Sequence, residues 1–103
     1  MIAKILNMLG LCARAGRLTT GEKACLDKIR MGGAYVALLD GAAAKNAEKS
    51  MTDACKYHDV PLIRTPEYAL GDAIGKPGRM ACVVTDEGFA KSIIKLSQQS
   101  INQ

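Results

Sequence analysis

The chain has 103 residues, of which 49% are hydrophobic and 23% are charged, and its formal net charge is +4. This composition excludes a disordered chain and predicts one domain, residues 1–103, with a core of its own. The excess charge lies in residues 1–49, where eight Lys and Arg stand against four Asp and Glu, whereas residues 50–103 carry six of each. A basic excess favours a nucleic-acid partner but is also common on soluble domains.

The first residues predict a helix that ends near Gly16. Ile5, Leu9 and Cys12 follow helical spacing, and glycine commonly ends a helix. These apolar positions are periodic rather than continuous, so the start does not resemble a signal peptide. The longest apolar run, residues 34–39, is too short for the ~20 residues of a membrane helix. We therefore expect a cytoplasmic protein with no membrane partner.

Two amphipathic segments are joined by residues 16–23, with the sequence GRLTTGEK. We predict a short edge strand over residues 17–20 and then a helix to about Met31. A helix N-terminus offers free N–H groups and a positive dipole end, which suit phosphate oxygens. Thr19 and Glu22 are three residues apart and match a capping box with Thr19 as the N-cap. Glu22 therefore either caps the helix or accepts hydrogen bonds from a ligand.

The rest of the chain alternates between strand and helix. Residues 34–39 are apolar without alternation, as expected for a central strand that is covered on both faces. The further predicted elements are a helix over 45–57 that buries Ala47, Met51, Ala54, Cys55 and His58, a strand over 60–64, a helix from Thr65 and Pro66 to Ile74, a strand over 80–84, and a last helix capped by Thr85 or Asp86. The polar tail, residues 98–103, is expected to fray. This order predicts an α/β fold with helices on both faces of a mainly parallel or mixed sheet.

Three loops would meet at one edge of such a sheet, where ligands bind in open α/β folds. They are residues 20–23, 40–46 and 75–80. Lys45, Asn46 and Lys49 open the 45–57 helix, and taken alone they indicate a solvated helix face. The loop 75–79, GKPGR, resembles a degraded P-loop, but proline stands where Ser or Thr is required. It is either a rigid turn or a clamp whose Lys76 and Arg79 contact phosphates.

Other chemistry finds little support in the sequence. The cysteines, at positions 12, 25, 55 and 82, form no C-x-x-C pair, and His58 is the single histidine, so we expect reduced, buried cysteines and no metal. No arrangement of nucleophile, base and carboxylate indicates catalysis. The aromatic residues are scattered and offer no stacking platform for unpaired bases, so any RNA ligand would have to be structured.

Six segments carry a further signal through their order and spacing. They lie at residues 9–18, 20–22, 35–39, 57–61, 70–76 and 85–91, with the sequences LGLCARAGRL, TGE, YVALL, YHDVP, LGDAIGK and TDEGFAK. Together they resemble a bacterial, YlxQ-type member of the kink-turn RNA-binding ribosomal protein family, the L7Ae/L30e group, over about residues 4–97. The resemblance implies a three-layer α/β/α sandwich with a four-stranded mixed sheet. It also implies a non-catalytic, cofactor-free monomer, ribosome-associated, that binds ribosomal or other non-coding RNA containing a kink-turn, a sharply bent duplex built on sheared G·A pairs.

The resemblance also implies a site. In the family, a Gly-x-Asn-Glu segment at the start of the second helix contacts the guanines, and a hydrophobic loop before the last strand packs on an extruded nucleotide. By position, the RNA-binding residues would be Thr20, Gly21, Glu22, Lys23, Lys45, Asn46, Ile74, Gly75, Lys76, Pro77, Arg79 and Met80. Glu22 would accept hydrogen bonds from guanine. The four cations of this set would contact phosphates, and Ile74, Pro77 and Met80 would pack on nucleotides.

This chain departs from the family pattern at three places. The family's Asn is Gly21 here, and a lysine three residues after the Glu is Cys25, so Lys23 or Lys28 would have to supply that charge. An Asp-Ala-Ser before the third helix is AAA, residues 42–44. Two other functions stay open: a protein-interaction subunit of this fold with weakened or lost RNA binding, and the RNA-binding appendage of a modifying enzyme. The length of the chain argues against the second.

Overall fold

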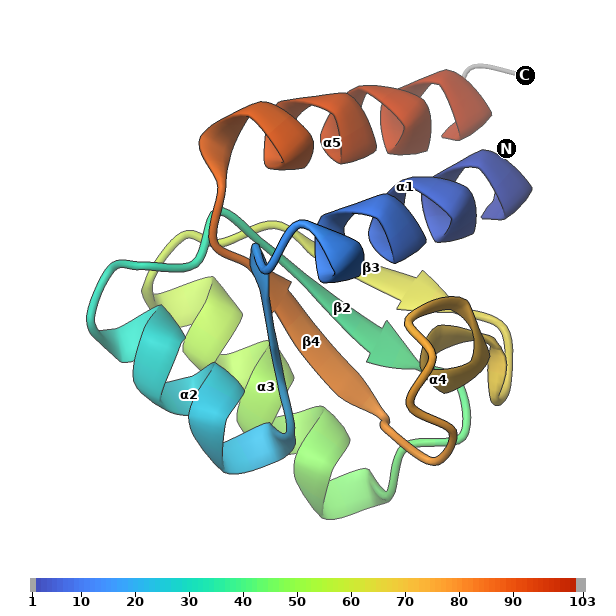
Figure 1. The fold of residues 1–103 in the computed structure, drawn as a ribbon. Helices are drawn as coiled ribbons and strands as arrows, with labels where there is room; N and C mark the ends of the chain where they lie inside the picture. Colours follow the sequence, from blue (N-terminus) through green and yellow to red (C-terminus); the bar gives the residue numbers. More distant parts are fainter. Residues whose placement is uncertain (1, 102–103) are drawn as a thin grey trace.

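Helices and strands alternate along the chain in the computed structural model, which describes residues 2–101 (Figure 1). In chain order the elements are α1 (Ile2–Arg14), β1 (Leu18–Thr20), α2 (Glu22–Arg30), β2 (Val36–Asp40), α3 (Lys45–Tyr57), β3 (Leu62–Thr65), α4 (Ala69–Ala73), β4 (Ala81–Val84) and α5 (Glu87–Ile101). The bounds predicted for α3 are those observed, and β1 is the predicted edge strand.

The four strands form one mixed sheet in the order β1-β4-β2-β3. Both β1 and β2 pair antiparallel with β4, and β3 pairs parallel with β2. The two central strands, β2 and β4, are buried along their whole length. Because side chains alternate along a strand, Val36 and Leu38 pack on one face of the sheet, and Ala37 and Leu39 pack on the other. This explains why the sequence of β2 is apolar without alternation.

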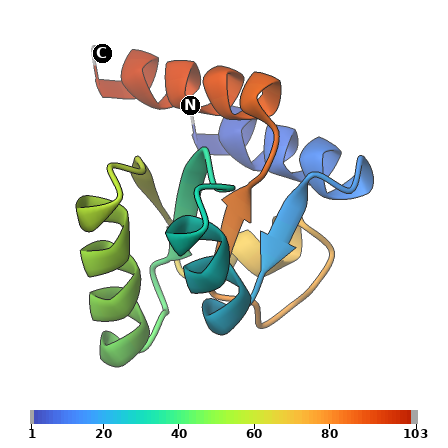
Figure 2. The ribbon, with the colours of Figure 1, turned by 90° about the vertical axis from the view of Figure 1, so that its left-hand side faces the viewer.

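Helices cover both faces of the sheet (Figures 1 and 2). On one face α1 and α5 lie side by side, with α4 against α1, whereas α2 and α3 pack together on the other face. The core under α1, α4 and α5 includes Ile5, Leu9, Cys12, Leu70 and Ile93. The core under α2 and α3 includes Cys25, Ile29, Met51 and Cys55. The fold is therefore the three-layer α/β/α sandwich with a mixed sheet that the resemblance implies.

Two predicted helix caps are wrong. Thr19 lies inside β1, where it pairs with Val83, and α2 has Gly21 at its N-cap position with no side-chain cap. Thr65 is the last residue of β3, paired with Asp40, and α4 begins only at Ala69. In both cases the backbone of the threonine is used by the sheet. The local capping pattern is thus overridden by strand pairing.

The last part of the chain differs from expectation in its length. The α5 helix begins as predicted after Asp86, whose Oδ2 accepts a hydrogen bond from Phe89 N at 2.9 Å. The helix continues to Ile101 and so includes residues 98–101 of the polar tail, for which fraying stays a prediction. The remainder of the predicted tail, residues 102–103, lies outside the described residues.

Two predictions about the core have opposite outcomes. The four cysteines are free and buried, as expected. His58 is exposed rather than buried, because it follows the last turn of α3, where its ring lies 4.9 Å from the ring of Tyr57. The helical spacing that suggested burial therefore extends one residue too far.

Candidate nucleic-acid interface

Three loops that the sequence singles out meet at one end of the sheet. Both β1 and β2 end there and β4 begins there: Gly21 N donates to Ala81 O at 3.1 Å, and Asp40 N donates to Met80 O at 2.8 Å. These bonds hold residues 20–23, 40–46 and 75–80 close together, toward the bottom of Figure 1. This set of three loops is termed the sheet-end surface below.

Glu22 presents an open acceptor on the sheet-end surface. It is the first residue of α2, and it is exposed. Its carboxylate takes part in no hydrogen bond or ion pair among residues 2–101. The capping-box alternative is therefore wrong. Glu22 is instead an acidic first-turn residue of a helix that no side chain caps.

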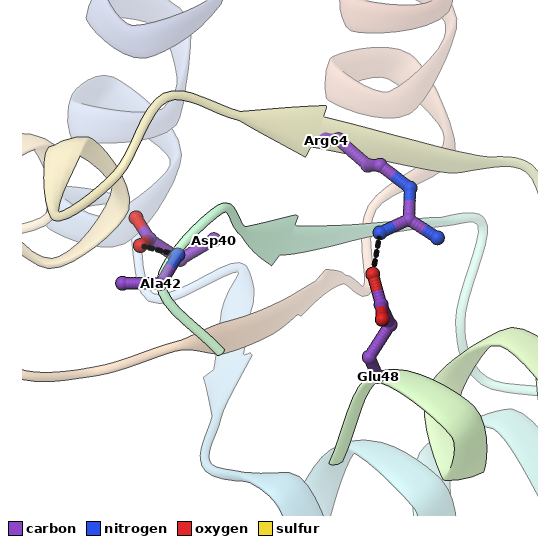
Figure 3. A network of polar contacts seen from close by, with 4 residues as sticks. All are labelled: Asp40, Ala42, Glu48 and Arg64. Carbon is purple, nitrogen blue, oxygen red and sulfur yellow. Dashed lines mark hydrogen bonds and ion pairs between the residues drawn. The ribbon is translucent and has the colours of Figure 1, made fainter. Parts of the chain in front are cut away.

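The cations of the sheet-end surface have no carboxylate partners. Lys23, Lys45, Lys76 and Arg79 are all exposed. The ion pairs found within residues 2–101 lie elsewhere, at Lys49–Asp53, Arg64–Glu48 (Figure 3) and Lys91–Glu87. These four cations are thus free of ion pairs within the described part of the chain. Exposed cations gathered on one surface attract an anionic ligand.

The loop 75–79 is a rigid turn that packs on α4. Lys76 N donates to Gly71 O at 2.9 Å, and Arg79 N donates to Lys76 O at 3.2 Å. Gly71 leaves no room for a side chain, because a Cβ there would lie 2.7 Å from Lys76 O. The loop leads from a helix into a strand, the reverse of a P-loop. It therefore presents Lys76 and Arg79 from a fixed frame, without a nucleotide cradle.

The apolar residues predicted to pack on nucleotides differ in exposure. Pro77 is exposed and Met80 is half-buried, but Ile74 is only 8% exposed and belongs to the core. An open cavity of about 160 Å³ lies beside it, lined by Ala13, Arg14, Leu18, Thr20, Ile74 and Lys76. Sequence reasoning missed Arg14 and Leu18, because α1 and β1 reach this cavity only through the tertiary fold.

The remaining residues of the predicted set lie around these groups. Thr20 is the half-buried last residue of β1, and Asn46 is exposed in the first turn of α3. Gly75 is exposed at the start of its loop and adopts a φ of 73°, a conformation that L side chains rarely adopt. The structure thus brings the whole predicted set to the sheet-end surface or to the cavity beside it.

The position three residues after Glu22, where the family has a lysine, carries no charge in this chain. Cys25 stands at that position and is buried; burial raises the pKa of its thiol to about 12, while the positive charge of Arg79 acts in the opposite direction. Lys28 lies at the other end of α2, where its Cδ would be 3.5 Å from a Cβ on Gly33. Lys28 thus lies in the last turn of α2 and Lys23 in the first turn, while Arg79 is close enough to act on Cys25.

Asp40 fixes the backbone around the sheet-end surface. Although it is only 2% exposed, its carboxylate accepts hydrogen bonds from Ala42 N at 2.9 Å, Tyr68 N at 2.7 Å, Leu70 N at 3.1 Å and Thr65 Oγ1 at 3.3 Å (Figure 3 shows the first). Burial alone would raise the pKa of this carboxyl, but these four hydrogen bonds outweigh burial and lower it. Sequence reasoning included residue 40 in the loop 40–46 and gave it no role of its own.

The comparisons with known proteins agree with this architecture. Residues 3–94 match the ribosomal protein L7Ae/L30e/S12e/Gadd45 family. The RNA-binding protein YlxQ of Bacillus subtilis is 40% identical over 90 residues, which cover 86% of this chain and 90% of that protein. The RNA-binding protein YlxQ of Enterococcus faecium is 35% identical over 94 residues, or 90% of each chain. The chain therefore belongs to the L7Ae/L30e/S12e/Gadd45 family, and the YlxQ-type resemblance seen in its sequence is confirmed.

Solved structures give the same fold. A protein of unknown function from Bacillus halodurans superposes with a TM-score of 0.87 at 34% identity, covering 91% of this chain and 96% of that one. The 15.5kD RNA binding protein of Giardia lamblia has a TM-score of 0.76 at 19% identity, covering 95% of this chain and 88% of that one. At that low identity the second likeness supports the fold alone.

Residues 2–101 contain neither a membrane-spanning helix nor a cluster of metal-ligating side chains. None of the helices there is long and apolar enough to cross a membrane. The same residues contain no group of three or more His, Cys, Asp or Glu side chains placed to hold a metal ion.

Proposed function

We propose that this chain binds structured RNA at the sheet-end surface and recognises kink-turns through their sheared G·A pairs. One observation carries the proposal: an exposed, unpartnered carboxylate, Glu22, lies at a helix N-terminus among cations that have no partner in the described chain. Membership of a ribosomal protein family supports it, as do the YlxQ relatives, which are named RNA-binding proteins.

Glu22 is the group that would distinguish guanine. A sheared G·A pair leaves the imino and amino donors of guanine within reach, and a carboxylate is an acceptor that fits two donors side by side. A carboxylate facing only phosphates would be repelled. A carboxylate on a cationic surface therefore fits a ligand whose base donates hydrogen bonds to it.

The neighbouring cations would hold the RNA backbone. Lys23 lies in the first turn of α2, Lys45 begins α3 and Lys76 lies in the loop 75–79, so they can contact phosphates on more than one strand. The free N–H groups at the start of α2 add donors that suit phosphate oxygens. Phosphate contacts of this kind fix position and orientation, and they leave the choice of sequence to the base contacts.

Apolar contacts would come from the loop 75–79 and the cavity beside it. Pro77 and Met80 are available to a nucleotide, whereas Ile74 offers only the small part of its side chain that reaches the cavity. The cavity joins Leu18 to Arg14 and Lys76, a combination that suits a base with its phosphate nearby. We therefore assign the extruded nucleotide to this side of the sheet-end surface.

The wider role follows from the same proposal. We infer a non-catalytic, monomeric component of ribosomal or other non-coding ribonucleoproteins that acts in the cytoplasm. The free, buried cysteines are in keeping with a reducing compartment.

A titration with two RNAs tests the proposal. One is a kink-turn duplex, and the other is the same duplex with its G·A pairs converted to Watson–Crick pairs. The proposal expects clearly tighter binding to the first. Equal, salt-sensitive affinity for both would leave only charge-driven binding, and no binding to either would favour the protein-interaction alternative.

A further inference from the structure

Gly21 and Arg79 are packed against each other across the sheet-end surface. Gly21 has a φ of 94° and a ψ of 140°, a backbone conformation available essentially to glycine. A Cβ at this position would also lie 3.1 Å from Arg79 Nη1. The four other glycines with positive φ, at positions 16, 32, 75 and 78, have open space where a Cβ would be. The Arg79 guanidinium thus lies where a side chain of residue 21 would begin.

The fold fixes the backbone from which the Arg79 side chain extends. The backbone of Arg79 packs against α4, since a Cβ on Gly71 would lie 3.1 Å from Arg79 N. From there the side chain extends across to Gly21, at the start of α2. Within residues 2–101 no carboxylate lies within 4 Å of it, although Glu22 is the next residue after Gly21. The Arg79 guanidinium, with its five N–H donors, therefore reaches the residue before Glu22 without forming an ion pair with the Glu22 carboxylate.

The geometry points to Arg79 as a guanine-reading residue, an inference that rests on the proposed function and assigns the specificity of that same site. Guanine offers two acceptors, O6 and N7, beside the N1 and N2 donors. The Arg79 fork would donate to O6 and N7 while Glu22 accepts from N1 and N2, so one base satisfies both side chains. A phosphate in the same place would meet Arg79 but would be repelled by Glu22. Guanine is therefore the ligand that fits the pair.

Removal of N7 from guanine isolates this contact. In a sheared G·A pair guanine uses N2 and N3, so replacing it with 7-deazaguanine leaves the pair intact and deletes only the N7 acceptor. The dissociation constants of wild type and Arg79→Ala would be measured on the kink-turn duplex with guanine or 7-deazaguanine at each sheared pair in turn. Wild type should lose at least about fivefold in affinity at one of these positions. Arg79→Ala should bind both RNAs equally.

Lys76→Ala is the matched control, because it removes a cation from the same loop without touching Gly21. It should weaken binding to both RNAs and keep the wild-type ratio between them. The Arg79 side chain is exposed and makes no hydrogen bond within residues 2–101, so its replacement should leave the thermal melt unchanged. Arg79→Gln provides a second variant of similar length should alanine disturb the loop.

The inference is overturned if the wild-type dissociation constant is insensitive to 7-deazaguanine at every sheared pair. It is also overturned if Arg79→Ala keeps the wild-type ratio of dissociation constants between the 7-deazaguanine and guanine RNAs. Either result would make Arg79 a phosphate contact. Loss of the ratio in Lys76→Ala would equally contradict it, because the effect would then not belong to Arg79. Failure of the proposed function is seen separately, as equal wild-type affinity for the kink-turn and Watson–Crick duplexes.

Discussion

Gly21, Glu22 and Arg79 show how single residues give the sheet-end surface its chemistry. The positive φ of Gly21 turns the chain from β1 into α2 and leaves room for the Arg79 guanidinium. Glu22 follows without a partner in the described chain, so its carboxylate stays available. In the sequence these positions read as a capping pattern and a basic loop. Their meeting depends on the sheet, which brings residue 81 beside residue 21.

Asp40 is the residue-scale prediction for stability. Because hydrogen bonds lower its folded pKa below an unfolded value of about 3.9, its contribution is complete above that pH and is lost as the pH falls through the lower folded pKa. Asp40→Asn should destabilise the protein near neutral pH by about 1.5–3 kcal/mol, the scale of hydrogen bonds to a charged group. Urea denaturation at pH 7 and at pH 3 would measure this. The difference in the free energy of unfolding between wild type and variant should be smaller at pH 3 than at pH 7. A larger difference at pH 3 would contradict the assignment.

At the scale of elements, the link between α4 and the loop 75–79 carries a prediction about binding. Gly71→Ala places a Cβ 2.7 Å from Lys76 O, so the loop must shift. Overpacking of this kind costs about 1–3 kcal/mol, and RNA affinity should fall because Lys76 and Arg79 move with the loop. Gly75→Ala is a useful comparison, since a Cβ there meets open space and the strain comes from a φ of 73° alone.

Thermal denaturation and the RNA titration would be run on both glycine variants. Loss of affinity in Gly71→Ala, measured where it remains folded, supports the view that α4 holds the loop in its binding position. Wild-type affinity in a destabilised Gly71→Ala would show that the loop adapts and that its frame does not matter for binding.

Helices and strands were predictable from the sequence where a single pattern of apolar residues ran through the whole element. The helical spacing of α3 and the uninterrupted apolar run of β2 identified both elements, because burial alone determines such patterns. The predictions for Thr19 and Thr65 were wrong because a threonine suits both a strand and an N-cap. The pairing partners, Val83 and Asp40, determine that both residues belong to strands. Local sequence does not contain those partners.

For the molecule as a whole, the family resemblance gave the layers and most of the candidate site, and the tertiary fold supplied the rest. The cavity beside Ile74 takes Arg14 from α1 and Leu18 from β1, which are distant in sequence from the loop that it adjoins. The buried carboxylate of Asp40 likewise joins β2 to the start of α4, 28 to 30 residues further on. Such long-range contacts leave no periodic trace in the sequence.

The charge of the whole surface predicts how binding responds to salt. If Lys23, Lys45 and Lys76 each neutralise one phosphate, the logarithm of the association constant should fall with the logarithm of the salt concentration, with a slope of roughly −2 to −3. Lys45→Ala should reduce the size of this slope by about one, because it removes one phosphate contact. Titrations between 50 and 200 mM KCl, roughly the range in which such effects are resolved, would test this. An unchanged slope would place Lys45 on the solvated face of α3 instead.

The central claim is that Glu22 accepts hydrogen bonds from the guanine of a sheared G·A pair. Its most direct test is the ratio of affinities for the kink-turn duplex and its Watson–Crick counterpart, measured for wild type and for Glu22→Gln at one salt concentration. Glu22→Gln should lose about 1–3 kcal/mol on the kink-turn, the scale of an unsatisfied hydrogen-bonding partner, and should lose none on the counterpart. A Glu22→Gln protein that keeps the wild-type ratio would contradict the claim.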